Sequence, residues 1–211
     1  MNLTRRAVLK TGLILGSLSA LVPTKSSFAT QKEKVLKGGN GLYVQPWFED
    51  SFLDLSEELE EAEQTGKQLV LLYEQAGCPY CKELHKVNLA DDAIQSFMKK
   101  HFRVVQLDIK GSREVTDFSG QTMTERTFSQ KWNIHFTPTV SFFPRQKANV
   151  IGKTGREAEA FRLTGYWKPF HFETVLHFVH SGSYKNENLQ SYLSNRVKDM
   201  KKNGQSVDLW N

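Results

Sequence analysis

The chain has 211 residues, of which 39% are hydrophobic and 24% charged, and its formal net charge is +5 at pH 7. This length suits one domain with a core of its own, so folding need not depend on disulfides as it does in a very small secreted scaffold. Four basic residues and no acid lie in the first 29 residues, so the remainder carries only +1 and lacks the basic stripe of a nucleic-acid-binding protein.

The N-terminal segment 1–29 has the layout of an export signal. It begins with basic residues that include the adjacent Arg5 and Arg6, continues with a short apolar stretch and ends with small residues at Ala29. The apolar stretch is shorter than the roughly 20 residues of a transmembrane helix. The segment resembles a bacterial twin-arginine signal, with Val8 where that signal often has Phe. We therefore expect a periplasmic protein that is cleaved after about Ala29, with a retained N-terminal anchor as the alternative.

The first elements after this signal are a lead-in and a helix. Residues 30–49 are largely polar, contain adjacent glycines and are expected to form a flexible lead-in. From Asp50 a helix is expected, ending at Gly66, because apolar residues recur at spacings of three and four. These apolar residues are Phe52, Leu55, Leu59 and Ala62.

Helices and buried strands alternate through the rest of the chain. We expect a strand at 69–73, a helix from 79 with a new start at 91–92, a strand at 104–109, a polar surface excursion at 111–123, a short helix capped by Thr124, strands at 139–143 and within 158–167, a helix at 169–182 and a basic helix at 186–202. This alternation indicates an α/β layered fold. The expected boundaries are 50–182 for the domain and 183–211 for a helical extension.

The only two cysteines, Cys78 and Cys81, directly follow the first buried strand. A haem-attachment motif would need His directly after the second cysteine, and Lys82 stands there. A zinc site would need a second ligand pair, but only His85 is near. A metal site stays an alternative, with copper more natural than zinc for two thiolates and one imidazole. A structural disulfide closing so small a loop would add little stability, so a redox dithiol is the favoured interpretation.

The position of this pair suits redox chemistry. Cys78 is expected where a strand ends and a helix begins, and free N–H groups at a helix N-terminus favour a thiolate, lowering the thiol pKa from about 8.5. Pro79 suits the first helical position because it has no N–H to leave unpaired. Cys81 is one turn further, so we expect Cys78 to be exposed to attack and Cys81 to be sheltered and within bonding reach.

A second feature lies far away in the sequence, where Thr137-Pro138 directly precedes an apolar strand. Proline can begin a strand but not occupy its centre, and an X-Pro bond can be cis and turn the chain tightly. Alone, this dipeptide usually marks an ordinary turn. Together with a strand, a Cys-x-x-Cys pair and a helix upstream, it becomes specific.

With these pieces the chain resembles the thioredoxin superfamily, over roughly residues 50–182. The resemblance implies an α/β thioredoxin-like fold: a central mixed sheet of four to five strands, helices on both faces and, here, an extra C-terminal helix. More narrowly, the chain is similar to periplasmic thioredoxins of the SoxW type, which pair a twin-arginine leader with Gly-Cys-Pro-Tyr-Cys.

The resemblance also implies roles for individual residues. Cys78 would attack a substrate disulfide and Cys81 would resolve the mixed disulfide, with no cofactor and no metal. A cis-proline loop would hold the substrate strand. The substrate-binding residues so implied are Thr137, Pro138, Pro79 and Tyr80.

The sequence departs from thioredoxin beneath the expected site. Thioredoxin has a buried aspartate and a lysine there, and Leu72 and Gln106 occupy the corresponding places. Glu74, two residues later on the same strand face, is a candidate proton acceptor. An exposed acid at the strand end is the alternative interpretation of Glu74.

These inferences predict a monomeric periplasmic thiol–disulfide oxidoreductase that works mainly as a reductase. Its expected partners are disulfide-containing periplasmic proteins, with sulfur-oxidation carriers implied by the resemblance, and a membrane thiol donor of electrons; no nucleic acid is expected. The alternatives are a Dsb-type disulfide oxidase or isomerase, and a copper-binding chaperone that uses Cys78, Cys81 and His85.

Overall fold

The computed structural model describes residues 36–207. The expected export signal at 1–29 and its cleavage site lie outside these residues. Within the described range, no helix has both the length and the apolar character needed to cross a membrane.

The elements alternate largely as expected. In chain order they are β1 (Leu36–Lys37), β2 (Tyr43–Val44), α1 (Leu55–Gln64), β3 (Gln68–Glu74), α2 (Pro79–Glu83), the π-helical turn η1 (Leu84–Asn88), α3 (Asp92–His101), β4 (Phe102–Asp108), β5 (Glu114–Thr116), β6 (Thr122–Thr124), α4 (Glu125–Lys131), β7 (Thr139–Phe142), the short turns η2 (Lys147–Asn149) and η3 (Gly155–Glu157), β8 (Phe161–Thr164), α5 (Pro169–His180), the turn η4 (Ser183–Lys185) and α6 (Leu189–Lys202).

Four strands form the central sheet, in the order β4-β3-β7-β8. The β3–β4 pair is parallel, whereas β7 runs antiparallel to both β3 and β8. The sheet is therefore mixed and four-stranded, which confirms the expected fold class. Strand β3 is buried along its whole length because it lies inside the sheet and is covered on both faces.

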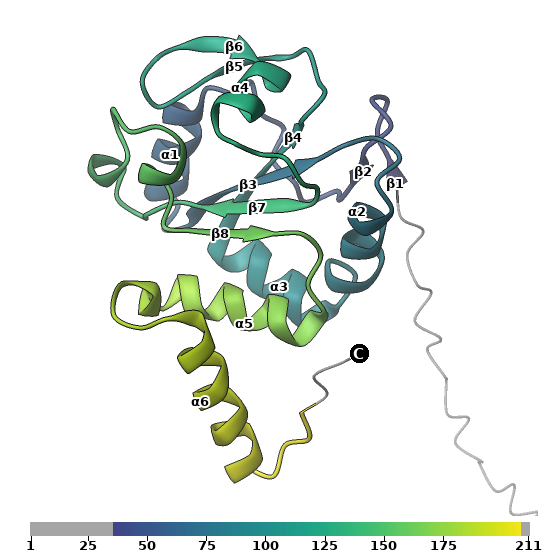
Figure 1. Cartoon of the computed structure of the whole chain (residues 1–211), viewed down its shortest axis with the longest axis vertical. Helices are drawn as coiled ribbons and strands as arrows, with labels where there is room; N and C mark the ends of the chain where they lie inside the picture. The colour runs from purple at the N-terminus through teal and green to yellow at the C-terminus, as the bar shows by residue number, and fades with distance from the viewer. Residues whose placement is uncertain (1–35, 208–211) are drawn as a thin grey trace, which may run out of the picture. The chain divides into compact units, whose positions relative to one another are not determined.

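Alternate side chains of β3 enter two separate cores, since successive residues of a strand point to opposite faces. Leu71 and Tyr73 pack with α1, α4 and the β5–β6 hairpin. Val70 and Leu72 pack with η1, α3 and α5. Figure 1 shows this layering, with the hairpin and α4 on one side of the sheet and α3 and α5 on the other; α6 continues beyond the end of α5.

Helix α1 begins later than expected. Asp54 is its N-cap, and its carboxylate accepts the backbone N–H groups of Ser56 and Glu57. Leu53, with φ of 63°, turns the chain just before the cap and is itself buried. Phe52 is 99% exposed, so its predicted place on the apolar face of the helix is wrong.

Two hairpins were not predicted. Within the expected lead-in, β1 and β2 pair antiparallel around a buried Leu42. Within the expected surface excursion, β5 and β6 pair in the same way, and Val115 and Phe118 are buried in the core. The excursion is therefore only partly a surface feature, because its apolar residues complete one face of the domain.

Several helix ends follow their sequence signals. Asp91 caps α3, which confirms the break expected there, and the hydroxyl of Thr124 caps α4. Pro169 is the first residue of α5, and Gly182 follows its end with φ of 78°. Asn188 caps α6, the expected C-terminal helix.

Candidate functional site

The two cysteines lie where β3 passes into α2. Cys78 is the N-cap residue of α2 and Pro79 follows at its first position, as the sequence predicted. Cys78 and Cys81 form a disulfide, with their Cα atoms 5.3 Å apart. The structure thus contains the pair in its oxidised form.

Two donors point at the sulfur of Cys78. The backbone N–H of Cys81 donates to it over 3.0 Å, and the hydroxyl of Thr137 lies 3.4 Å from it. The carbonyl oxygen of Thr137 is 3.5 Å from the same sulfur. When the disulfide is reduced, the two donors and the helix N-terminus all favour negative charge on Cys78, so its thiol is the one prepared to ionise.

Neither sulfur is widely exposed. Cys78 retains 4% of its surface and Cys81 retains 1%, so the order of exposure is as expected although Cys78 is more covered than predicted. Large apolar side chains stand out around the pair instead: Tyr80 is 61% exposed and Phe136 is 67% exposed. The rim of the site therefore carries exposed aromatic side chains.

The loop before β7 brings Thr137 to the cysteines, although 59 residues separate it from Cys78. The Thr137–Pro138 peptide bond is cis, as the sequence suggested, and Pro138 is buried. The loop is held by the hydroxyl of Thr139, which donates to the Phe136 carbonyl over 2.7 Å. It is held also by the backbone N–H of Gly165, which donates to the Pro138 carbonyl over 2.8 Å.

Glu74 is fully buried at the end of β3, so the alternative of an exposed strand-end acid is wrong. Its Oε2 lies 3.0 Å from Nε2 of His85 and also accepts the side-chain amide of Gln106. Its Oε1 has no hydrogen-bond partner within the described part of the chain. Leu72, at the place of the missing aspartate, is an ordinary core residue.

His85, in η1, is fully buried, and its ring contacts this carboxylate. Its Nδ1 lies 3.3 Å from the side-chain amide nitrogen of Gln45, in the segment that follows β2. Both ring nitrogens therefore have protein partners. Across residues 36–207, no group of three or more His, Cys, Asp or Glu side chains is arranged to hold a metal ion. This arrangement gives no support to a copper site that uses Cys78, Cys81 and His85.

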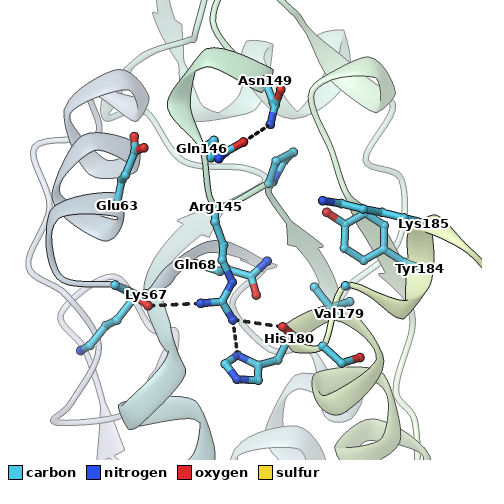
Figure 2. A pocket seen from close by; sticks show the side chains of 14 residues that line it. Glu63, Lys67, Gln68, Arg145, Gln146, Asn149, Val179, His180, Tyr184 and Lys185 are labelled. Carbon is cyan, nitrogen blue, oxygen red and sulfur yellow. Dashed lines mark hydrogen bonds between the residues drawn. The ribbon is translucent and has the colours of Figure 1, made fainter.

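A separate cavity lies at the beginning of β3, where Gln68 is one of the residues that line it (Figure 2). The guanidinium of Arg145 lies in this cavity and donates to Nδ1 of His180 over 2.7 Å and to its carbonyl oxygen over 3.0 Å. Burial, followed by the positive charges of His101 and Arg145, lowers the pKa of His180 to about 4. None of the site residues predicted from the sequence lines this cavity.

Sequence reasoning missed three contributors to the site. Gln45 lies 40 residues before its partner His85, in a segment that carried no signal of structure. Phe136 is a single aromatic residue before the Thr-Pro pair, and its exposure was not foreseeable. His85 was considered only as a metal ligand, although its place one helical turn beyond Cys81 does indicate the same helix face.

A parallel β3–β4 pair extended by antiparallel β7 and β8, with helices on both faces, a Cys-x-x-Cys pair beginning a helix and a cis-proline loop beside it, defines a thioredoxin-fold protein. The family model for a thioredoxin-like domain matches residues 55–180. The chain therefore belongs to the thioredoxin-like domain family. No curated protein matches it significantly.

The chain is similar to several solved structures, of which the first described below supports the fold. A thioredoxin-fold protein from Helicobacter pylori is 19% identical, with a TM-score of 0.51 over 71% of this chain and 99% of that one. A thioredoxin from Thermus thermophilus is 20% identical, with a TM-score of 0.44 over 60% and 83%. The reduced periplasmic thioredoxin SoxS from Paracoccus pantotrophus is 19% identical, with a TM-score of 0.35 over 56% and 99%.

Proposed function

We propose that this protein is a thiol–disulfide oxidoreductase that works mainly as a protein-disulfide reductase through Cys78 and Cys81. The observation that carries the proposal is the pair of donors aimed at the Cys78 sulfur at the start of α2. A nucleophilic thiolate is the species that such donors stabilise. The resolving thiol is already within bonding reach.

The proposed reaction has two exchange steps. The Cys78 thiolate attacks a substrate disulfide, forms a mixed disulfide with one substrate sulfur and expels the other as a thiolate. Cys81 then attacks Cys78, which forms the intramolecular disulfide and releases the second substrate thiolate. The protein dithiol loses two electrons and the substrate disulfide gains them, so a thiol donor must restore the dithiol.

Glu74 is the proposed proton acceptor for Cys81. It is buried at the end of β3 and contacts His85 of η1, and within residues 36–207 its Oε1 has no hydrogen-bond partner and so could take a proton. A positioned carboxylate is one of the side chains that act as a general base in enzymes. Glu74 would thus replace the aspartate whose place Leu72 occupies.

Substrate binding is proposed at the rim around the disulfide. The residues concerned are Pro79 and Tyr80 on α2 and Thr137 and Pro138 on the facing loop. The loop brings backbone groups beside the reacting sulfur, where an extended peptide is able to pair with it by strand addition. The exposed ring of Phe136 adds apolar surface for the same partner.

The cellular setting is also a proposal. An export signal at 1–29 would place the protein in a bacterial periplasm, followed by a lead-in at 30–49, the domain at 50–182 and a helical extension at 183–211. The clients would be disulfide-containing periplasmic proteins, with a membrane thiol donor supplying electrons to a monomer. The SoxW-type resemblance favours sulfur-oxidation carrier proteins among these clients.

A measurement of the reduction potential tests the direction of the reaction. The oxidised protein is equilibrated with a dithiothreitol series, and the fraction of dithiol is counted by alkylation and mass spectrometry. A reductase is expected near the thioredoxin value of about −270 mV. A value near about −120 mV would instead favour the Dsb-type oxidase.

A further inference from the structure

The carboxylate of Glu74 is held at one oxygen and free at the other. Oε2 accepts two N–H donors, one from His85 and one from Gln106. Oε1 is buried and, among residues 36–207, has no hydrogen-bond partner. Buried carboxylate oxygens are normally paired, so a single free one is a functional signal that needs a reason.

The contacts of His85 indicate which of its ring nitrogens carries the hydrogen. The amide nitrogen of Gln45 lies 3.3 Å from Nδ1 of His85 and 3.5 Å from the His85 carbonyl oxygen. A carbonyl oxygen only accepts, so the Gln45 group that faces it is the N–H donor. Nδ1 must then accept as well, which leaves the ring proton on Nε2, where it donates to Glu74 over 3.0 Å. These contacts therefore favour one tautomer of the ring, with the N–H on Nε2.

We infer that His85 is a positioning residue that holds Glu74 with Oε1 free to receive the proton of Cys81, and that Gln45 sets the tautomer in which His85 does so. This inference rests on the proposed function. In the resolving step the Cys81 S–H bond breaks, the proton goes to Oε1 and the Cys81 sulfur bonds to Cys78. The Cys78–substrate bond breaks, and the departing substrate thiolate takes a proton from water.

Glu74 is linked to the resolving cysteine through His85. His85 lies four residues after Cys81 along α2 and η1, a spacing that puts two side chains on one face of a helix, and its ring contacts the Glu74 carboxylate. Cys81 is 1% exposed, so its proton has little access to bulk water. A buried base on the inner side of the helix supplies the acceptor that solvent does not.

Residues in and just after the β1–β2 hairpin cover the side of His85 that faces away from Glu74. The rings of Tyr43 and Phe48 lie 6.0 and 5.6 Å from the His85 ring. Gln45 and Gln106 also line a surface cleft beside the hairpin, so the amides that hold the pair also separate it from water. The other charged side chains on the adjoining elements, together with Tyr43, are all at least partly exposed: Lys37, Tyr43, Lys82, Glu83, Lys86, Arg103 and Asp108.

A two-phase assay separates the step in question. The full chain, reduced with dithiothreitol and desalted, is mixed with dithiobis-nitrobenzoate across a pH series. Attack by Cys78 releases one coloured thiolate, and resolution by Cys81 releases the second. Glu74→Gln and His85→Phe are expected to slow the second phase at least about tenfold and to change its pH profile, with the first phase little affected.

Conservative variants distinguish positioning from packing. His85→Gln retains an N–H donor and is expected to recover most of the second-phase rate. Gln45→Ala, a change outside the core, is expected to displace the pH profile of the second phase without unfolding the chain. The matched control His171→Gln, in α5, should behave as the wild type.

Each result decides one question. A wild type that releases no second thiolate would refute the proposed function itself. A wild type that releases both, with Gln45→Ala and His85→Phe variants that keep its pH profile while Glu74→Gln alters it, would overturn the positioning role of His85. The same role fails if His85→Gln is folded and as slow as His85→Phe.

Discussion

Two histidines near opposite ends of β3 have opposite surroundings. At the Glu74 end, His85 is completely buried and directs its ring N–H to a carboxylate. At the Gln68 end, His180 accepts a hydrogen bond from the guanidinium of Arg145, and its ring lies 3.9 Å from that of His101. The first site is built around a buried carboxylate, whereas the surroundings of the second disfavour protonation of the His180 ring.

The difference shows what a neighbouring charge does to one residue type. A guanidinium that donates to a ring nitrogen requires an unprotonated ring, and nearby cations oppose a further positive charge. A carboxylate instead attracts the ring proton and keeps it at hydrogen-bond distance. The following experiments test this contrast, beginning with the largest expected effect.

Replacing the proposed nucleophile, Cys78, should abolish activity, whereas a replacement at the Gln68 end should not. Cys78→Ser is expected to show no insulin disulfide reduction, because no other thiol is prepared as a thiolate by the start of α2. Cys81→Ser should accumulate mixed disulfides with substrate, detected by mass spectrometry. His180→Gln is the control and should keep full activity. Stronger reactivity of Cys81 than of Cys78 toward iodoacetamide in the reduced wild type would contradict the assigned order.

Removing the partner of the buried acid should cost stability. His85→Leu leaves Glu74 buried with one donor fewer, and removing one partner of a buried hydrogen bond costs about 1–3 kcal/mol. The double variant Glu74→Leu, His85→Leu should recover most of that loss, because replacing both partners by apolar groups leaves neither of them unpaired. Urea unfolding at pH 7 measures both. A single variant within about 0.5 kcal/mol of the wild type would show that the pair is not a stability element.

Acid should destabilise the protein through the Gln68 end. The pKa of His180 is lowered to about 4 in the folded state from an ordinary 6.5, so the unfolded chain takes up the proton first. The free energy of unfolding therefore falls as the pH drops from about 6.5 towards 4. For a partly exposed group the expected loss is about 1–2 kcal/mol.

The comparison that isolates this loss is wild type against His180→Gln, by urea unfolding at several pH values. The variant should lose less stability over the same range, while carboxylates that titrate in both proteins cancel. If the free energy of unfolding falls equally with decreasing pH in the two proteins, folding does not lower the pKa of His180.

Salt should have the smallest effect and should act at one end only. At pH 4, close to the lowered pKa of His180, raising sodium chloride screens the repulsion between the protonated ring and Arg145, which stabilises the wild type by a few tenths of a kcal/mol. The thermal midpoint of His180→Gln should respond less. The second-phase rate of the dithiol assay should not change, because the Glu74 site is shielded from solvent ions.

The local parts of the fold were predictable from the sequence. Continuous apolar runs predicted the buried strands, and single residues such as Asp91, Thr124 and Pro169 predicted where helices begin. The strand–cysteine–helix junction followed from the same local signals. These features depend on neighbours in the chain, so a reading of short segments recovers them.

The parts that depend on long-range contact were not predictable. Phe52 matches the helical spacing, but the capping by Asp54 and the turn at Leu53 exclude it from the helix. Glu74 contacts Gln106 of β4 and His85 of η1, and His85 in turn contacts Gln45, which lies 29 positions before Glu74 in the chain. No local pattern encodes such a meeting, because each residue is unremarkable alone.

The π-helical turn η1 has a mechanical consequence. Its wider winding, closed by the Leu89 N–H to the Leu84 carbonyl over 2.9 Å, leaves both His85 and Asn88 fully buried. His85 is tied to strand β3, and Asn88 donates to the Trp167 carbonyl over 2.9 Å, in the segment between β8 and α5. The helical segment that follows the cysteines is thus hydrogen-bonded to two parts of the domain that are far apart in the sequence. It cannot tilt without breaking both bonds. We therefore expect that, on binding, the partner protein changes conformation and this helical segment does not.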